Sequence, residues 1–213
     1  MFVEFVQEWW KAKEYTPEGL TQGKDTWEIL NKEENQKGIP WPWRGIQNKL
    51  FDIQSPRLYL LTAGSGVGKS EVLKEIAIHI AETDKEAKLG VLFLEESIRE
   101  TVKIFTGMKL GLNLRIPDNV PSMDDKRKAW SDLFDNDRWV FWDHFGSNNI
   151  ESVCNQVRFI ATNFGAKYIF LDHVSIVVSA QEHGDERKAL DEIMTKLRML
   201  VQECNICLFL EVT

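Results

Sequence analysis

The residues Ala63-Gly64-Ser65-Gly66-Val67-Gly68-Lys69-Ser70 lie between an apolar run, Leu58–Leu61, and an amphipathic stretch that begins at Glu71. Glycines in such a loop let successive backbone N–H groups turn toward one anion. Lys69 can then reach the β- and γ-phosphates, and the Ser70 hydroxyl can bind Mg²⁺. A helix that follows directs its positive end at the same phosphates. A strand before this motif and a helix after it predict the phosphate-binding loop of a nucleoside triphosphatase rather than an ordinary glycine-rich turn.

One position departs from the usual form of this motif. The first residue is normally glycine, and here it is Ala63. Alanine fits wherever the backbone does not need a positive φ, so we expect the loop to be intact. All eight residues from Ala63 to Ser70 are therefore predicted to bind the nucleotide, ATP or another NTP or dNTP.

Length and composition exclude several classes of protein. A chain of 213 residues, 43% hydrophobic and 28% charged, can form one α/β domain or one domain with an appendage. The net charge of −7 argues against a broadly basic surface for nucleic acid, although a local basic lining inside an assembly stays open. No apolar run approaches the roughly 20 residues of a membrane span, and Met1-Phe2-Val3-Glu4 lacks the basic start of a signal peptide. We expect a soluble, cytoplasmic protein without a membrane partner.

The three cysteines, Cys154, Cys204 and Cys207, cannot form a fully paired disulfide framework. The spacing Cys-Asn-Ile-Cys suggests zinc or redox chemistry, but zinc needs about four ligands at fixed spacing. Cys207 also starts the apolar run Cys207–Leu210. We therefore predict that these thiols pack in the core, where free cysteine acts as a small hydrophobe.

From Leu58 onward, short apolar runs alternate with stretches of helical periodicity. The predicted strands cover residues 58–61, 91–94, 139–142, 168–171 and 206–210. Apolar residues at helical spacing mark two helices, 150–164 and 190–201, with Asn148 or Asn149 and then Asp185 as candidate N-caps. This alternation predicts an α/β fold, a mainly parallel sheet with helices on both faces. Ligands bind such sheets at the carboxyl ends of the strands, where the phosphate loop lies.

The first 57 residues differ in kind, being rich in tryptophan and charge. They include a helical candidate, Asp25–Glu34, and a segment with two prolines and two glycines, Gly38–Gly45, which predicts an extended connector. We assign residues 1–37 to an arm or linker and residues 38–213 to the core. Three tryptophans of the arm need an apolar surface, either this chain's own core or a neighbouring subunit: Trp9, Trp10 and Trp27.

Two further predicted strands end in carboxylates. Asp172 follows the fourth strand and would lie beside Mg²⁺ bound through Ser70. Many motor ATPases place a glutamate directly after this aspartate, but His173 occupies that position here. Glu95 and Glu96 follow the second strand and would project at the same sheet edge. Glu95 is therefore the predicted general base, with Glu96 second.

Two rival classes fit the sequence less well. Asp143-His144-Phe145-Gly146 matches the Asp-x-x-Gly of GTPases, but the guanine-reading Asn-Lys-x-Asp is missing, because its nearest match, Asn31-Lys32-Glu33-Glu34, lies upstream of the loop. Small-molecule kinases usually need an arginine-rich lid, which the sequence does not show after the site. His144 and His173 flank strand ends and could touch nucleotide or metal, or could be solvated or capping residues. The two remaining histidines are expected to be uninvolved: His79 and His183.

Four motifs in order resemble the helicase half of bacteriophage primase-helicases and, more distantly, mitochondrial Twinkle and bacterial DnaB. These motifs are Ala63–Ser70, Leu94–Ser97, Leu171–Ser179 and Asp185–Lys188. The resemblance, over residues 38–213, implies a RecA-like P-loop NTPase core and a hexameric homo-oligomeric ring. It also implies NTP-driven translocation on single-stranded DNA with 5′-to-3′ unwinding, and replisome partners such as primase and DNA polymerase.

The resemblance also implies roles for individual residues. Positions matching Lys69 and Ser70 bind phosphate and metal, the match to Glu95 is the catalytic base, and the match to Asp172 supports Mg²⁺. The arm resembles a linker whose helix docks on the neighbouring subunit, which favours that environment for Trp27.

Two departures from the family qualify this expectation. No primase or zinc-ribbon segment precedes the core, and the sequence ends at Glu211-Val212-Thr213, before the family's γ-phosphate sensor, DNA-binding loops and arginine finger. We therefore expect a truncated or split gene product, or part of a longer chain, that binds nucleotide and alone hydrolyses it poorly. Arg187 and Lys188 could contact DNA or could simply be a solvated helix start. The alternative function is a RecA-like nucleotide-binding assembly or regulatory module without helicase activity of its own.

Overall fold

The computed structural model describes residues 21–31, 38–143, 149–173 and 186–212, and the chain divides into two units between residues 36 and 37. In the first unit a 3₁₀ turn, η1 (Gly23–Asp25), leads into a short helix, α2 (Thr26–Leu30). The predicted helix from Asp25 is thus confirmed over α2, while residues 32–37 lie outside the described part. Three large apolar side chains of α2 are exposed: Trp27, Ile29 and Leu30.

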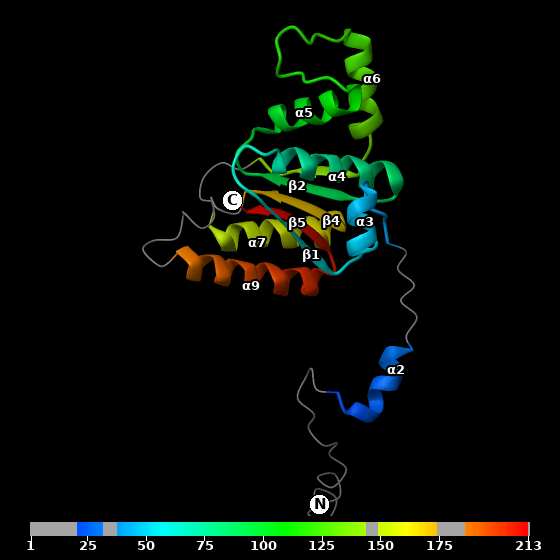
Figure 1. Cartoon of the computed structure of the whole chain (residues 1–213), viewed down its shortest axis with the longest axis vertical. Helices are drawn as coiled ribbons and strands as arrows, with labels where there is room; N and C mark the ends of the chain where they lie inside the picture. Colours follow the sequence, from blue (N-terminus) through cyan, green and yellow to red (C-terminus); the bar gives the residue numbers. More distant parts are fainter. Residues whose placement is uncertain (1–20, 32–37, 144–148, 174–185, 213) are drawn as a thin grey trace, which may run out of the picture. The chain divides into compact units, whose positions relative to one another are not determined.

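The second unit is built on one parallel sheet of five strands in the order β1-β5-β4-β2-β3 (Figure 1). The strands are β1 (Arg57–Thr62), β2 (Leu89–Phe93), β3 (Trp139–Phe141), β4 (Tyr168–Asp172) and β5 (Cys207–Val212). Each predicted strand overlaps one of these. The second was predicted two residues too late at its start, and Leu94 lies in the turn beyond β2. The last two strands along the chain, β4 and β5, lie in the middle of the sheet, between β1 and β2. Both are fully buried along most of their length.

Helices cover both faces of this sheet, as predicted (Figure 1). They are α3 (Arg44–Leu50), α4 (Lys69–Thr83), α5 (Ile98–Leu110), α6 (Met123–Phe134), α7 (Ile150–Phe159) with its π-helical extension η2 (Ile160–Phe164), and α9 (Glu186–Cys204). α7 and α9 pack on one face, and α4 packs on the other. The two helices predicted with bounds within the core, 150–164 and 190–201, are confirmed by α7 with η2 and by α9.

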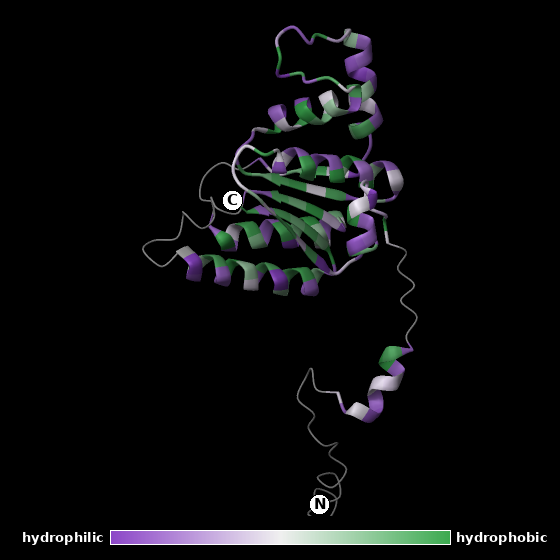
Figure 2. Cartoon of the chain, viewed as in Figure 1, coloured by the Kyte–Doolittle hydropathy of each residue, from purple (hydrophilic) through white to green (hydrophobic). Residues whose placement is uncertain are grey.

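Successive side chains along each buried strand point to opposite faces of the sheet, so the core consists of two layers. Leu92 and Leu171 face α7 and α9, whereas Phe93, Phe170 and Phe209 face α4 and its neighbours. The sheet and the inner sides of the helices are accordingly apolar, and the outer sides of the helices are polar (Figure 2). A sheet buried on both faces explains why its strands appear in the sequence as continuous apolar runs.

Local capping sets the ends of the helices that follow β2 and β3. Ser97 precedes α5 and accepts a hydrogen bond from Glu100 N at 3.3 Å. Asn149 precedes α7 and accepts one from Ser152 N at 2.8 Å. Asn149 is therefore the N-cap of the two asparagines considered, while Asn148 and Asp185 lie outside the described residues.

The segment Gly38–Gly45 is not simply an extended connector, and in this respect the prediction was wrong. Ile39 forms an antiparallel bridge with Ile53, and α3 already begins at Arg44. Trp41 is buried, with its ring edge-on to Tyr59 at 5.1 Å between ring centroids. An aromatic side chain of this size stabilises the edge of the core, so the segment belongs to the folded unit, in line with the assignment of residues 38–213 to the core.

The cysteines pack as predicted, with Cys154 and Cys207 buried and Cys204 partly buried. Burial raises the pKa of the Cys207 thiol to about 12, which keeps it protonated. The described residues contain no cluster of three or more metal-ligating side chains of the histidine, cysteine and carboxylate types. Within the same part of the chain, every helix is too short or too polar to span a bilayer.

Candidate functional site

The phosphate loop connects the end of β1 to the start of α4, which begins at Lys69. Gly66 (φ 75°) and Gly68 (φ 89°) adopt the left-handed backbone conformation that glycine tolerates best, and Gly68 is the N-cap of α4. Among the described residues, the non-glycine residues with positive φ are Phe51 and Asn205, so Ala63 is not strained. The substitution of alanine for the usual glycine is therefore compatible with the loop.

Lys69 is buried although it is charged, and its ammonium group has three partners. It donates to the carbonyl oxygens of Ala63, at 2.8 Å, and Gly64, at 3.0 Å. It also pairs with Glu211 Oε1 at 3.3 Å. These contacts hold the cation inside the loop, at the N-terminus of α4, where backbone N–H groups and the helix dipole favour an anion.

Two carboxylates lie at the tips of the adjacent central strands, beside the loop. Leu171 of β4 pairs with Leu210 of β5. Asp172 and Glu211, the next residue on each strand, therefore lie side by side and point to the same face of the sheet. Ser70 Oγ donates to Glu211 Oε2 at 2.9 Å. Asp172 and Glu211 are both buried, and Asp172 Oδ1 has no hydrogen-bond partner in the described structure.

The pKa values of these two carboxylates are shifted in opposite directions. Burial, together with the neighbouring Glu211 carboxyl, raises the pKa of Asp172 to about 7, against the opposing effects of Ser70 and Lys74. Burial acts in the same direction on Glu211, but hydrogen bonding with Asp172, Ser70 and Lys69 outweighs it and lowers the pKa of Glu211. A negative charge therefore resides on Glu211, and Asp172 gains one readily near neutral pH.

The oxygen donors of this corner suit a hard divalent cation. A buried carboxylate oxygen without a partner is costly, and a cation would satisfy Asp172 Oδ1. Mg²⁺ is bound through one or two carboxylates together with substrate phosphates, and Ser70 Oγ lies next to the same group. Ser70 and Asp172 could thus hold Mg²⁺, as the sequence predicted.

Glu95 lies in the turn after β2, on the far side of β4 from Glu211. Its carboxylate is more than half exposed, at 58%, and Oε1 lies 3.4 Å from His173 Nδ1. An exposed carboxylate at the carboxyl end of a strand can reach a water molecule, and the adjacent imidazole can orient the carboxylate. His173, one of the two histidines considered for a role in the site, is thus a partner of Glu95, whereas His144 and His183 lie outside the described residues.

Glu96 is committed to other contacts, unlike Glu95. Its carboxylate oxygens lie 3.2 Å from the ammonium of Lys74, a fully buried residue of α4. Arg115 Nη2 donates to Glu96 Oε1 at 2.8 Å and also approaches Glu71, with 3.7 Å between the charged atoms. Glu96 therefore ties the tip of β2 to the phosphate-loop helix, which leaves Glu95 as the carboxylate with room for a water molecule.

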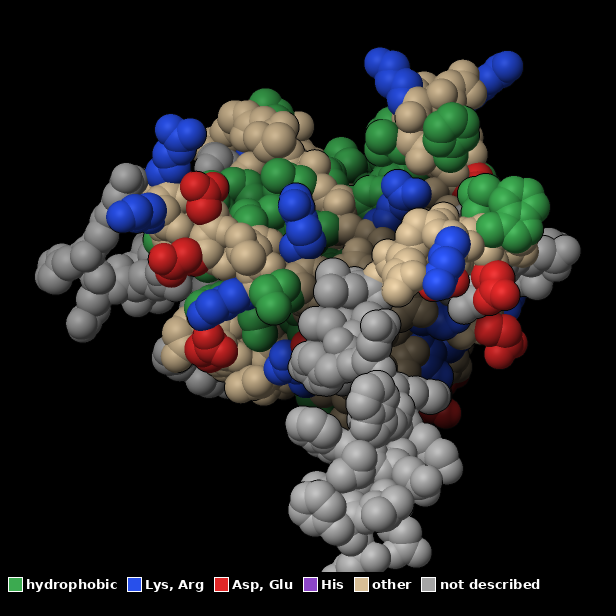
Figure 3. Space-filling view, turned by 90° about the horizontal axis from the view of Figure 1, so that it is seen from below, with side chains coloured by type: hydrophobic (Ala, Val, Ile, Leu, Met, Phe, Trp, Pro, Cys, Tyr) green, Lys and Arg blue, Asp and Glu red, His purple; other side chains and the backbone are tan. Residues whose placement is uncertain are grey.

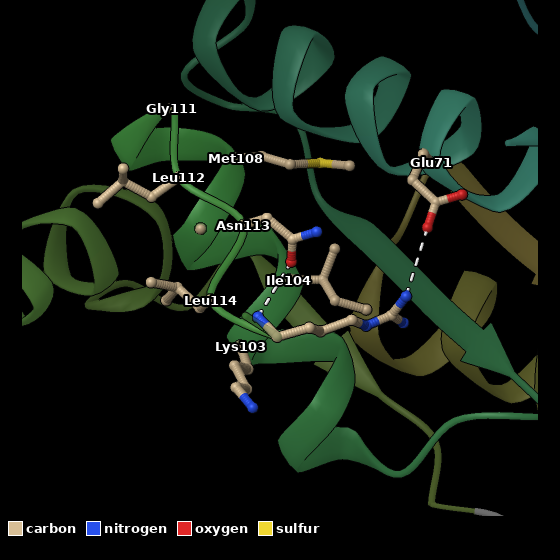
Figure 4. A pocket seen from close by; sticks show the side chains of 10 residues that line it. Glu71, Lys103, Ile104, Met108, Gly111, Leu112, Asn113 and Leu114 are labelled. Carbon is tan, nitrogen blue, oxygen red and sulfur yellow. Dashed lines mark hydrogen bonds and ion pairs between the residues drawn. The ribbon is translucent and has the colours of Figure 1, made fainter. Parts of the chain in front are cut away.

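A cavity of about 290 Å³ lies beside this network rather than in the phosphate loop (Figure 4). Its wall is formed by α5 and the turn after it, with Ile104, Met108, Leu112 and Leu114 as apolar members. Figure 4 shows Glu71 reaching toward it from the first turn of α4, joined by the ion pair with the arginine. The loop itself is open to solvent, with Ala63–Val67 exposed, as a site for a large anion requires.

The GTPase-like aspartate is remote from the phosphate loop. Asp143 follows β3, the edge strand farthest from β1, and four strand spacings of about 4.8 Å separate the two strands. Arg187 and Lys188 are exposed in the first turn of α9. Basic and acidic side chains lie among apolar ones on the face shown in Figure 3.

The DnaB-like helicase C-terminal domain family matches residues 38–211. The chain belongs to this family. A DNA helicase/primase of Enterobacteria phage T3 is 28% identical to this DnaB-like chain over an alignment of 211 residues, and the match covers 95% of the chain and 37% of that relative. The chain thus spans little more than a third of the length of this curated relative.

Solved structures share the fold of this DnaB-like domain. The ATPase domain of G40P matches 89% of the chain and 68% of its own length, with a TM-score of 0.70 at 14% identity. A DnaB-like replicative helicase, described with its interactions with primase, matches with the same score and identity over 99% of this chain and 52% of its own. A KaiC-like protein from Pyrococcus horikoshii follows, with a TM-score of 0.55, 18% identity, and coverage of 84% and 69%. The predicted RecA-like fold is thereby confirmed, and family and fold together imply the use of a nucleotide.

Two residues of the DnaB-like site escaped the sequence analysis. Glu211 directly follows the apolar run Cys207–Leu210, the same pattern that identified Asp172 and Glu95, so the signal was present but was not applied to the last strand. Lys74 lies four residues after Ser70, on the same side of α4, among apolar neighbours. A lysine within an apolar helix stripe is a signal of a buried ion pair.

Proposed function

We propose that this chain carries the nucleotide-hydrolysing motor of a ring-forming replicative DNA helicase. The observation that carries the proposal is the alignment, along one sheet edge, of the phosphate loop, Glu211, Asp172 and Glu95 on neighbouring strands. Membership of the DnaB-like family and the likeness to a phage DNA helicase/primase support the helicase assignment. The proposed cofactors are ATP, or another NTP or dNTP, and Mg²⁺.

In the proposed reaction, some residues bind the phosphates and Mg²⁺, and others activate the attacking water. The backbone of Ala63–Gly68 and Lys69 would cradle the β- and γ-phosphates. Ser70 and Asp172 would hold Mg²⁺, which neutralises phosphate charge when bound. Glu95, oriented by His173 at 3.4 Å, would orient the attacking water and accept its proton as general base.

The proposed assembly is a hexameric ring on single-stranded DNA, with unwinding in the 5′-to-3′ direction. Residues 1–37 would form the linker arm and residues 38–213 belong to the motor core. The exposed apolar side chains of α2, among them Trp27, support docking of the arm on a neighbouring subunit. Primase, DNA polymerase and other replisome proteins are proposed partners, and the predicted cytoplasmic location belongs with this role.

The proposal is tested by replacing Glu95 with glutamine. We expect Glu95→Gln to bind nucleotide with nearly unchanged affinity and to hydrolyse it about 10²–10⁴-fold more slowly, the usual contribution of a general base. Steady-state NTPase assays with and without single-stranded DNA measure the second effect, and Glu100→Gln, an acidic residue of α5, is the control. Hydrolysis that survives in Glu95→Gln would contradict this role of Glu95. Nucleotide binding without hydrolysis or unwinding by the wild-type protein would favour the regulatory module instead.

A further inference from the structure

Glu211, near the end of β5, contacts two residues of the phosphate loop through its side chain. Its two carboxylate oxygens have different partners. Oε1 pairs with Lys69 at 3.3 Å, and Oε2 accepts a hydrogen bond from Ser70 Oγ at 2.9 Å. The side chain is 7% exposed, so these contacts are shielded from water. A buried carboxylate directed at the two loop residues that would contact phosphate and metal is a costly feature, which indicates a function.

The position of Glu211 follows from the order of the strands. β5 lies between β1, which leads into the loop, and β4, which ends in Asp172. Leu61 pairs with Glu211 on one side, and Asp172 is next in register on the other. Glu211 thus stands between the loop and the carboxylate that would bind the metal.

We propose that Glu211 is a positioning residue of the metal and phosphate site, an inference that rests on the proposed function. By accepting the hydroxyl hydrogen of Ser70, Glu211 leaves the lone pairs of Ser70 Oγ for the cation. Its negative charge favours a cation at this corner and disfavours a polyphosphate that arrives without one. Glu211 therefore makes nucleotide binding depend on Mg²⁺, in the way that outer carboxylates orient metal ligands elsewhere.

The experiment measures how much Mg²⁺ improves nucleotide binding. Isothermal titration calorimetry with AMP-PNP, in EDTA and in MgCl₂, gives two Kd values whose ratio is the magnesium enhancement. Glu211→Gln keeps the size of the side chain and an acceptor oxygen but removes the charge. We expect its enhancement to fall by about 10–100-fold, the usual effect of losing an outer-shell partner, through weaker binding in MgCl₂ and equal or tighter binding in EDTA.

Two further variants separate positioning from folding. Glu211→Asp keeps the charge but is shorter, so its enhancement is expected to lie between those of the wild type and Glu211→Gln. Glu75→Gln removes an exposed charge from the same helix as Ser70 and is expected to leave the enhancement unchanged. Thermal unfolding of each variant reports whether it folds.

The outcomes distinguish this inference from the proposed function. An enhancement in Glu211→Gln within twofold of the wild type overturns the inference, as does an equal loss of affinity in both buffers, which indicates a structural role only. If the wild-type protein binds AMP-PNP in neither buffer, the proposed function fails and the inference fails with it.

Discussion

At the scale of single residues, Asp172 is the most strongly perturbed acid of the site, because it is buried beside Glu211. Its pKa is raised to about 7, compared with roughly 3.9 in an unfolded chain. The folded protein therefore holds this proton more tightly. The resulting stability is fully present below about pH 4 and is lost as the pH rises through about 7.

Replacing Asp172 with asparagine removes this pH dependence. We expect Asp172→Asn, measured in EDTA, to unfold at a higher temperature than the wild type at pH 8, by roughly 2–4 °C for each kcal/mol removed. At pH 5 the difference is expected to be smaller, because the folded wild type is then mostly protonated at this position. Differential scanning calorimetry at the two pH values checks this, and an equal shift at both would contradict it.

Deprotonation of Asp172 also predicts that Mg²⁺ binding strengthens between pH 6 and pH 8.

Residue types at strand ends made most of the site predictable. The phosphate loop could be recognised from its glycines, lysine and serine between a strand and a helix, and Asp172 and Glu95 because an apolar strand followed by an acid is a local pattern. The partners of these residues could not, since the contacts from Glu211 to Ser70 and from His173 to Glu95 depend on strand order. A sequence shows which strands end in acids, but not which ends are neighbours.

At the scale of secondary-structure elements, Lys74 and Glu96 join α4 to the tip of β2. The Lys74 ammonium also lies over the Phe93 ring, 4.9 Å from its centroid. A fully buried lysine needs its partner, because an unpaired buried charge costs about 3–5 kcal/mol. This contact fixes the turn that carries Glu95 relative to the phosphate loop.

Paired substitutions separate the stability of this contact from its effect on catalysis. We expect Glu96→Gln alone to lower the free energy of unfolding by about 3 kcal/mol, because it leaves the fully buried ammonium of Lys74 without its carboxylate partner. The double variant with Lys74→Met should recover much of that loss, yet hydrolyse nucleotide about 10²-fold more slowly, because a displacement of about 1 Å in the turn that carries Glu95 has that effect. Urea denaturation and NTPase assays measure the two effects. Recovery of both stability and turnover in the double variant would show that the pair is only structural.

The cap of α7 gives an element-level test away from the site. Asn149→Ala removes the acceptor for Ser152 N and is expected to cost about 1 kcal/mol of stability. Asn149→Asp keeps an acceptor and should retain most of it. Nucleotide affinity should not change in either variant. Chemical denaturation that finds alanine and aspartate equally stable would contradict the capping role.

Elements were predicted best where the core dictates them. Buried strands and the amphipathic helices α7 and α9 carry strong apolar patterns, so their existence was clear and their bounds differ by only a few residues. α3 was missed, because the prolines and glycines before it suggested an extended chain. Packing of Trp41 against Tyr59 of β1, a contact between residues that are not neighbours in the sequence, folds that segment instead.

At the scale of the whole molecule, residues 1–36 form one unit and residues 37–213 another, so the proposed arm and core can be separated. We expect deletion of residues 1–36 to leave the unfolding temperature and the nucleotide affinity of the core nearly unchanged. Ring formation should be lost, if α2 docks on a neighbouring subunit through Trp27. Analytical ultracentrifugation with AMP-PNP and Mg²⁺ measures the assembly. Trp27→Ala in the full chain should weaken it in the same direction, and unchanged assembly in both variants would contradict the role of the arm.

The central claim is that the loop from Ala63 to Ser70 binds a nucleoside triphosphate through Lys69. Calorimetric titration of AMP-PNP with Mg²⁺ into the wild type, Lys69→Ala and the control Lys85→Ala tests it most directly, because Lys85 is an exposed lysine beyond the end of α4. Lys69→Ala removes the buried cation that we propose contacts the phosphates and should weaken binding at least about 100-fold, as expected for a lost charge-assisted contact of roughly 3 kcal/mol. Lys85→Ala should match the wild type. Equal affinity of Lys69→Ala and the wild type would contradict the account.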